Sequence, residues 1–168
     1  TKNILKRLIE NETINLHASH RKDMQNFGSA YYYYLSKEYG KAIKCIIELN
    51  HPKFMYKYDI RNLELKIYFE KKNYIELKNV LHNYHENIKS EPLFTRIDKD
   101  KYKIMIDYFN DLIRADEKYS MSHDILPFEY LLNQIKSDAG FVMKQWFTHK
   151  VESIIEAHYL EYELKKQN

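Results

Sequence analysis

The sequence predicts an all-α fold of about seven or eight antiparallel helices stacked in pairs, with no β-sheet. Only three glycines and three prolines occur among the 168 residues, whereas a sheet with many tight turns needs both residue types. Apolar residues recur at helical spacing along most of the chain. In addition, a pattern of helix, short break and helix returns after a shift of 35 residues, which is typical of stacked helix pairs.

Breaks in the periodic pattern divide the chain into helices. Gly40 separates the first long helix from the second, and Pro52 ends the second because proline cannot continue a helix. Asp98 is expected to cap the fifth helix, Pro127 suits the first turn of the sixth, and Ser137-Asp138 precedes the last. After a short apolar-periodic piece over residues 3–9, the expected helices cover residues 14–38, 41–49, 53–71, 74–89, 98–118, 127–136 and 139–165.

The 35-residue shift places YYLSKEY, residues 33–39, on YFEKKNY, residues 68–74. Both copies carry a lysine between their aromatic residues, Lys37 in the first and Lys72 in the second. A helix pair of this length and pattern resembles the tetratricopeptide repeat, in which such pairs stack into a right-handed superhelix. The resemblance implies a core formed by Tyr33, Ala42, Ile46, Tyr68, Leu77 and Leu81.

The repeat is degenerate. Bulky Leu49 and Tyr84 stand where the family has a small residue, the family's glycine is missing, and Pro52 comes about two positions early. We expect one helical-repeat domain over residues 1–168, the C-terminal part of a longer chain because it starts at Thr1 without methionine. Its expected parts are repeat 1 over 22–52, repeat 2 over 53–89, a divergent third pair over 98–136 and a terminal helix over 139–165.

The terminal helix gives a second resemblance. Over most of its length the chain is similar to a group of uncharacterised bacterial helical-repeat proteins that end in a long helix with a Trp-apolar-x-x-Lys element, here Trp146 to Lys150. We expect Trp146 and Phe147 to pack back onto the preceding helices, because the last unit of a repeat array otherwise exposes its stacking face.

No pattern in the sequence indicates catalysis, and we expect no enzyme activity and no cofactor. Glycine-rich phosphate loops, HExxH and GxSxG are all missing. The pairs His17/His20 and His82/His85 share a helical face, but neither has a recognisable third ligand, so we expect solvated histidines and no metal. Cys45, the single cysteine, lies in an apolar run and is expected to be a buried, inert thiol.

Charge and hydropathy limit the cellular locations and the classes of partner that we expect. The net charge is +3 with both signs mixed along the chain, which weighs against nucleic-acid binding through one basic face. No run of about 18 apolar residues indicates a membrane span. We expect a cytoplasmic protein whose partner is another protein or a peptide.

The sequence therefore favours a protein-interaction or scaffold module that holds a peptide or helix in the concave groove of a helical array. In the run of four tyrosines, residues 31–34, Tyr33 takes a core position, Tyr32 packs on an adjacent helix, and the other two face the groove. By the repeat register the groove residues are Tyr31, Tyr34, Leu35, Asn62, Lys66 and Phe69. Two alternatives stay open: single-stranded RNA or DNA bound by stacking on some of the 16 tyrosines, and a purely structural segment of a larger solenoid.

Overall fold

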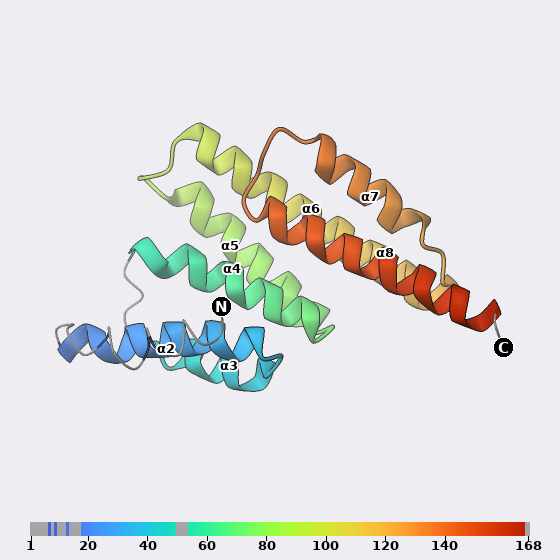
Figure 1. Ribbon diagram of the computed structural model, residues 1–168. Helices are drawn as coiled ribbons and strands as arrows, with labels where there is room; N and C mark the ends of the chain where they lie inside the picture. The colour runs from blue at the N-terminus through green and yellow to red at the C-terminus, as the bar shows by residue number, and fades with distance from the viewer. Residues whose placement is uncertain (1–6, 8, 10–12, 14–17, 50–53, 167–168) are drawn as a thin grey trace. The chain divides into compact units, whose positions relative to one another are not determined.

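The computed structural model describes residues 7, 9, 13, 18–49 and 54–166, and in these residues it contains helices but no strand (Figure 1). The all-α prediction is therefore confirmed for the described chain. The helices are α2 (Ala18–Leu35), α3 (Tyr39–Ile47), α4 (Phe54–Glu70), α5 (Tyr74–Ser90), α6 (Arg96–Ser122), α7 (Leu126–Ser137) and α8 (Lys144–Lys166). The chain divides into two compact units, residues 1–80 and 81–168, with the boundary inside α5.

The links α2–α3 and α4–α5 have the same backbone geometry, 35 residues apart. Lys37 and Lys72 both adopt positive φ, 60° and 53°. In the first link the amide of Lys37 donates to the carbonyl of Tyr34 over 2.9 Å and that of Glu38 to Tyr33 over 2.9 Å. The equivalent bonds of the second link, from residues 72 and 73 to residues 69 and 68, measure 2.9 and 3.0 Å. This is the Schellman closure of a helix C-terminus, formed with lysine where glycine is common.

This closure corrects the expected first break. The first helix ends at Leu35 rather than Glu38, and Gly40 lies in the first turn of α3 instead of between the helices. An added Cβ at Gly40 would meet no atom within 4 Å, so no close contact requires glycine there. The helix stops because Lys37 turns into the left-handed region and the closing bonds satisfy its last carbonyls.

Unit 1, residues 1–80, is built around α4. Ala30 of α2, Ala42 of α3, and Leu63 and Ile67 of α4 are fully buried and pack together. The small residues Ala30 and Ala42 allow the helix backbones to approach closely. The buried side chains of α4 point to several sides of the helix rather than along one stripe, although Asp59 and Arg61 stay exposed.

The predicted core positions are confirmed in part. Ala42 and Leu77 are fully buried and Leu81 is 3% exposed. Tyr33, Ile46 and Tyr68 are only half-buried, so their prediction as fully buried residues was wrong. Tyr33 and Ile46 lie at the margin of the unit 1 core rather than inside it, and they pack against that core from its edge.

In unit 2, residues 81–168, α6 begins with a capping box at Thr95. The Thr95 hydroxyl accepts from the amide of Asp98 over 3.2 Å, and the Asp98 carboxylate accepts from the amide of Thr95 over 3.1 Å. Asp98 is therefore the third helical residue and not the cap that the sequence suggested. Pro127 does lie in the first turn of α7, as predicted.

Aromatic rings join α6 to α8. Phe109 lies 4.7 Å from Phe147 and 5.5 Å from Trp146 between ring centroids, and both Phe side chains are fully buried. Further along, the Tyr119 hydroxyl lies 2.9 Å from Nδ1 of His158. Since both contacts advance in the same direction, α6 and α8 run parallel, with α7 packed against each of them (Figure 1). The predicted packing of Trp146 and Phe147 onto preceding helices is confirmed.

The link before α8 is longer than predicted, since the helix begins at Lys144 and not at Ala139. The Asp138 carboxylate accepts from the amide of Gly140 over 3.1 Å, which forms an Asx turn. Met143 then adopts a φ of 67°, outside the right-handed helical region. The turn and this backbone conformation keep the intervening residues out of the helix.

Candidate protein-binding surfaces

The six residues predicted to line a groove lie on α2 and α4 of unit 1, but two of them are not accessible. Asn62 is 8% exposed and Phe69 only 3%. Tyr31, Tyr34 and Lys66 are half-buried. Leu35 is 38% exposed and is the most open of the set. The repeat register thus places these side chains on two helices of one unit, but it does not give them one accessible face.

Tyr34 and Phe69 occupy equivalent places in the two helix pairs. The Tyr34 ring lies 6.0 Å from the ring of Tyr39, and the Phe69 ring lies 6.0 Å from the ring of Tyr74. In each case the partner is the first residue of the next helix. These contacts indicate a packing role for the two rings, which is to seal the joint between consecutive helices.

Tyr31, Asp59 and Lys66 form a partly desolvated polar cluster between α2 and α4. Burial, with a further contribution from Asp59, raises the pKa of Tyr31 to about 12. Burial also raises the pKa of Asp59, opposed by Lys66, and lowers the pKa of Lys66, opposed by Asp59. For both ions the cost of losing water exceeds their mutual attraction. Asp59 is exposed, whereas Tyr31 and Lys66 are half-buried, so the main effect of the cluster is to join the two helices.

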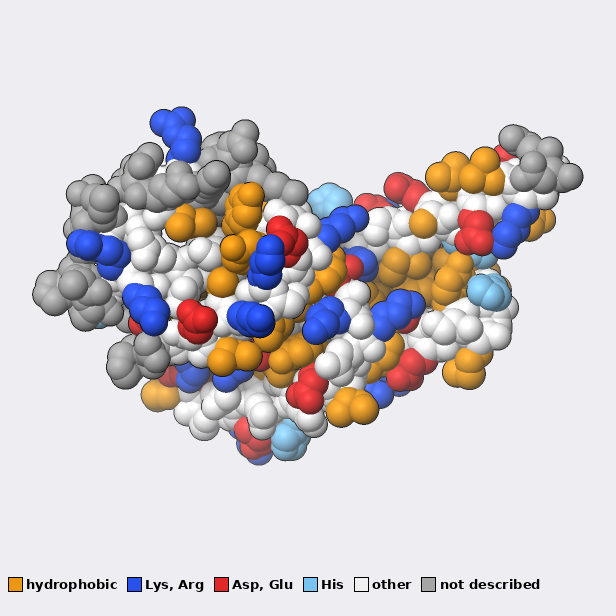
Figure 2. All heavy atoms as spheres, turned by 90° about the horizontal axis from the view of Figure 1, so that it is seen from below, with side chains coloured by type: hydrophobic (Ala, Val, Ile, Leu, Met, Phe, Trp, Pro, Cys, Tyr) orange, Lys and Arg blue, Asp and Glu red, His pale blue; other side chains and the backbone are white. Residues whose placement is uncertain are grey.

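The C-terminal end of α8 is the most exposed apolar segment in the part of the chain that the structure describes. Residues 159–166 are all exposed, although four of them are large and apolar. The exposed fractions are 46% for Tyr159, 64% for Leu160, 53% for Tyr162 and 55% for Leu164. Figure 2 shows hydrophobic side chains gathered on this projecting end. We call residues 159–166 the α8 end.

The α8 end is exposed because α8 continues beyond its neighbour. Tyr119 lies beside His158, and α6 ends three residues later, at Ser122. With parallel helices of equal rise per residue, α6 covers α8 only to about residue 161. The remaining residues therefore have no helix of unit 2 alongside them on that face.

A hollow of about 410 Å³ adjoins the α8 end. Tyr119 and His123 of the α6 C-terminus contribute two rings, whose centroids are 5.6 Å apart. The Tyr119 hydroxyl is hydrogen-bonded to His158, which fixes the orientation of both side chains. The other lining residues, Glu161, Tyr162 and Lys165, belong to the α8 end itself.

The charges at this hollow compensate one another. Lys165 Nζ lies 2.7 Å from Oε1 of Glu161. Their hydrogen bond lowers the pKa of Glu161 and raises the pKa of Lys165. Lys166 Nζ lies 4.4 Å above the centre of the Tyr162 ring. With aromatic walls and a neutral ion pair, the hollow suits an apolar or aromatic side chain better than a free ion.

The histidine predictions have different outcomes. His17 lies outside the described residues, so the His17/His20 pair is not tested. His82 is exposed, and His85 is half-buried beside a second, smaller hollow. Among the described residues no group of three or more His, Cys, Asp or Glu side chains is placed to hold a metal ion.

Cys45 is half-buried at the edge of the unit 1 core, less enclosed than the sequence suggested. Desolvation raises the pKa of its thiol, which keeps it protonated and weakly nucleophilic. The expectation of an unreactive thiol thus has a physical basis even without full burial. None of the described helices has the length and apolar character needed to cross a membrane.

Sequence reasoning missed both the α8 end and its hollow. The segment LEYELKK, residues 160–166, alternates apolar and charged residues and has no motif that distinguishes it from an ordinary amphipathic helix. Tyr119 and His158 are 39 residues apart, and nothing in the sequence links them. The exposure depends on where α6 ends beside α8, and the sequence carries no signal for that alignment.

Comparisons with protein-family models, with curated proteins and with solved structures found no match to this chain.

Proposed function

We propose that this protein is a non-catalytic interaction module that binds an amphipathic helix of another protein at the α8 end. The observation that carries the proposal is the exposure of four large apolar side chains in residues 159–166. Isolated exposed apolar residues are ordinary, whereas a contiguous group of them marks an interaction surface. Tyrosines and leucines within about two helical turns supply that group here.

The spacing of these residues suits a helical partner. Leu160 and Leu164 are four apart and share one face of α8, where a partner helix can lay its own apolar stripe. The hollow beside them is large enough to accept one side chain of that partner. Glu161, Glu163, Lys165 and Lys166 sum to zero charge, so apolar contact rather than charge attraction supplies the affinity.

A role for unit 1 as a degenerate tetratricopeptide-like array belongs to the same proposal. Its support is the pair of matching Schellman links, which have corresponding hydrogen bonds after a shift of 35 residues. We infer that α2–α3 and α4–α5 are two copies of one helix-pair unit that starts a right-handed superhelix. Because Asn62 and Phe69 are buried, we assign partner binding to the α8 end and not to the groove of this array.

The test compares two pairs of substitutions at similarly exposed apolar positions. Leu160→Glu with Leu164→Glu alters the α8 end, whereas Leu93→Glu with Ile97→Glu alters sites that are 68% and 67% exposed elsewhere in unit 2. Tagged wild-type chain and each tagged double variant are used to capture proteins from the native cells, and the captured proteins are quantified by mass spectrometry. We expect a partner that is lost with the first pair and retained with the second.

Two results would overturn the proposal. Equal loss in both pairs would show that capture depends on general surface hydrophobicity. A doubling of the molar mass in light scattering, abolished by Leu160→Glu with Leu164→Glu, would make the occupant a second copy of this chain instead of another protein.

A further inference from the structure

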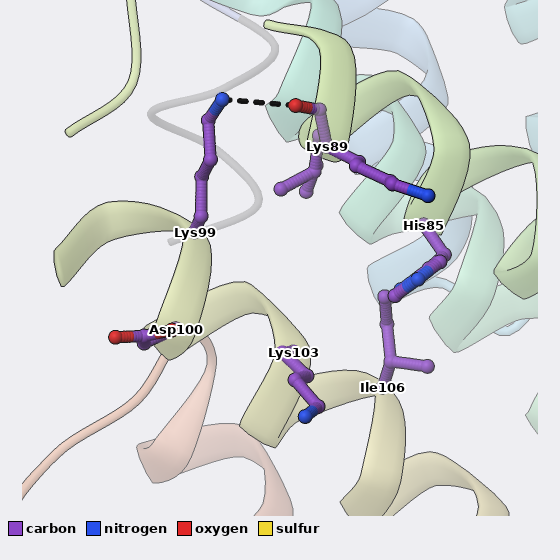
Figure 3. Close-up of a pocket in the computed structure, with 7 residues that line it drawn as sticks. His85, Lys89, Lys99, Asp100, Lys103 and Ile106 are labelled. Carbon is purple, nitrogen blue, oxygen red and sulfur yellow. Dashed lines mark hydrogen bonds between the residues drawn. The ribbon is translucent and has the colours of Figure 1, made fainter. Parts of the chain in front are cut away.

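A second hollow in unit 2 is lined mainly by basic residues. It has a volume of about 150 Å³ and lies between the last turns of α5 and the first turns of α6 (Figure 3). Lys89 comes from α5, and Lys99 and Lys103 come from α6. His85 adds an imidazole, so four basic groups surround a space of a few water molecules.

The single carboxylate that lines this hollow does not neutralise it. In Figure 3 the side chain of Asp100 points away from those of Lys89 and Lys99. The carboxylate of Asp98 is taken up by the capping box at Thr95, with Oδ2 only 2.6 Å from the Thr95 hydroxyl. Within the described residues, no carboxylate forms an ion pair with the lysines of the hollow.

This arrangement differs from that of other lysines in the same unit. Lys118 pairs with Asp124 at 3.1 Å, and Lys136 pairs with Glu152 at 2.8 Å. By contrast, Lys99 donates to a neutral group, the carbonyl oxygen of Lys89, over 2.9 Å. That bond caps the carbonyl end of α5 and reduces its negative potential, while the first turns of α6 contribute the positive end of a helix dipole. The potential in the hollow is therefore positive.

The base of the hollow is apolar. Ile88 and Ile106, which line it, are 4% and 8% exposed. A ligand that carries carbon atoms next to its charge gains from contact with these side chains, whereas a hydrated inorganic ion does not. The lysine stems are flexible, and their ammonium groups, which now turn to different sides, can rotate toward an anion.

We propose that this hollow binds a phosphate group, and that it prefers a small phosphate monoester with an apolar substituent to free phosphate. Lys89, Lys99 and Lys103 supply N–H donors and positive charge to the phosphate oxygens. Ile88 and Ile106 contact the substituent. This site is separate from the α8 end, so the inference does not depend on the proposed protein partner.

The test is a nuclear magnetic resonance titration of the full chain at constant ionic strength, set with chloride. Phenyl phosphate and inorganic phosphate are added separately while backbone amide shifts are followed. We expect saturable shifts at the amides of residues 88, 89 and 103, with tighter binding of phenyl phosphate. Saturation by inorganic phosphate at equal or lower concentration would overturn the preference for an ester.

Matched variants test which lysines act. Lys89→Gln with Lys103→Gln should weaken phenyl phosphate binding about tenfold, since each removes one exposed charge contact. Lys101→Gln removes a charge of the same sign from α6 outside the hollow and should leave binding unchanged. Equal weakening by both sets would show a diffuse charge effect, and unsaturable shifts in the wild type would exclude a site. Either result overturns the proposal.

Discussion

Phe69 shows how burial depends on the surroundings of a single side chain. Its place in the repeat register is equivalent to that of Tyr34, yet Phe69 is 3% exposed whereas Tyr34 is half-buried. The difference follows from the helices that carry them, because α4 has buried side chains on several sides and α2 does not. Positions 35 residues apart in the two helix pairs thus share local geometry without sharing accessibility.

Phe69→Ala should therefore lower the free energy of unfolding by about 3–5 kcal/mol, because it removes a buried ring and leaves a cavity. Tyr34→Ala should cost less, since part of that ring already contacts solvent. Urea denaturation of both variants, followed by circular dichroism, measures the difference. A loss below about 1 kcal/mol for Phe69→Ala would contradict the assignment of this ring to the joint between helices.

Tyr31 predicts a loss of stability in alkali. Its pKa rises from 10.0 to about 12 on folding, mainly through burial. Between these two pH values the unfolded chain releases the proton while the folded chain keeps it, so stability is lost as the pH rises through this window and is unaffected below it. Unfolding free energies at pH 9 and pH 11 should differ less in Tyr31→Phe than in the wild type. Tyr130→Phe, at a ring that is 68% exposed, is the control, and an equal effect there would refute the role of Tyr31.

The helices themselves were largely predictable, because their order follows from apolar periodicity and from the positions of proline. The sequence predicted the start of α5 at Tyr74 and the start of α7 near Pro127 to within about one residue. The predicted helix boundaries were less accurate after α2 and before α8. There the positive φ of Lys37 and of Met143 sets the boundary, and these residue types do not signal it. Sequence rules expect glycine in such places.

The left-handed backbone conformation of Lys37 gives a testable prediction. A lysine in the left-handed region costs about 1 kcal/mol relative to glycine. Lys37→Gly should therefore raise the melting temperature, whereas Lys44→Gly, at an exposed position inside α3, should lower the free energy of unfolding by about 1 kcal/mol. Destabilisation by Lys37→Gly would show that the Lys37 side chain contributes more than the backbone strain costs.

The capping box at the start of α6 gives a similar prediction for a helix N-terminus. Thr95→Ala removes the hydroxyl that accepts from the amide of Asp98, and should cost about 0.5–2 kcal/mol. Thr95→Ser keeps the hydroxyl and should remain close to the wild type. Thermal denaturation measures both, and equal loss in the two variants would mean that the methyl group of Thr95 matters rather than its hydrogen bond.

Within a whole unit, the sequence did not predict how far each helix extends along its neighbours. The prediction that Trp146 and Phe147 pack back onto earlier helices was correct, because an apolar stripe on a long helix must be covered. The exposure of the α8 end depends instead on where α6 stops beside it. The α8 end was therefore missed, while six residues chosen by repeat register included two buried ones.

Two truncated chains should show that the first and second halves of α8 have different roles. A chain ending at Asp138 loses the buried side chains of Phe141, Phe147 and Val151, which exposes Phe109 and its neighbours to water. We expect this chain to aggregate, because the newly exposed rings form a contiguous apolar surface. A chain ending at His158 keeps all three buried side chains, and the described residues that it loses, 159–166, are all exposed. Its thermal stability should stay close to that of the full chain, although it loses the Tyr159 hydroxyl bond to Glu129.

Capture of the partner, in contrast, should be lost in the chain ending at His158, because the α8 end is missing while the folded support beneath it remains. Light scattering and circular dichroism report the fold of the shortened chain, and quantitative capture reports its binding. If that chain unfolds or aggregates like the shorter one, residues 159–166 act as part of the cap. If it stays folded and still captures the partner, the binding surface lies elsewhere. Only a folded chain that no longer binds agrees with a helix whose first half completes the core and whose second half meets the partner.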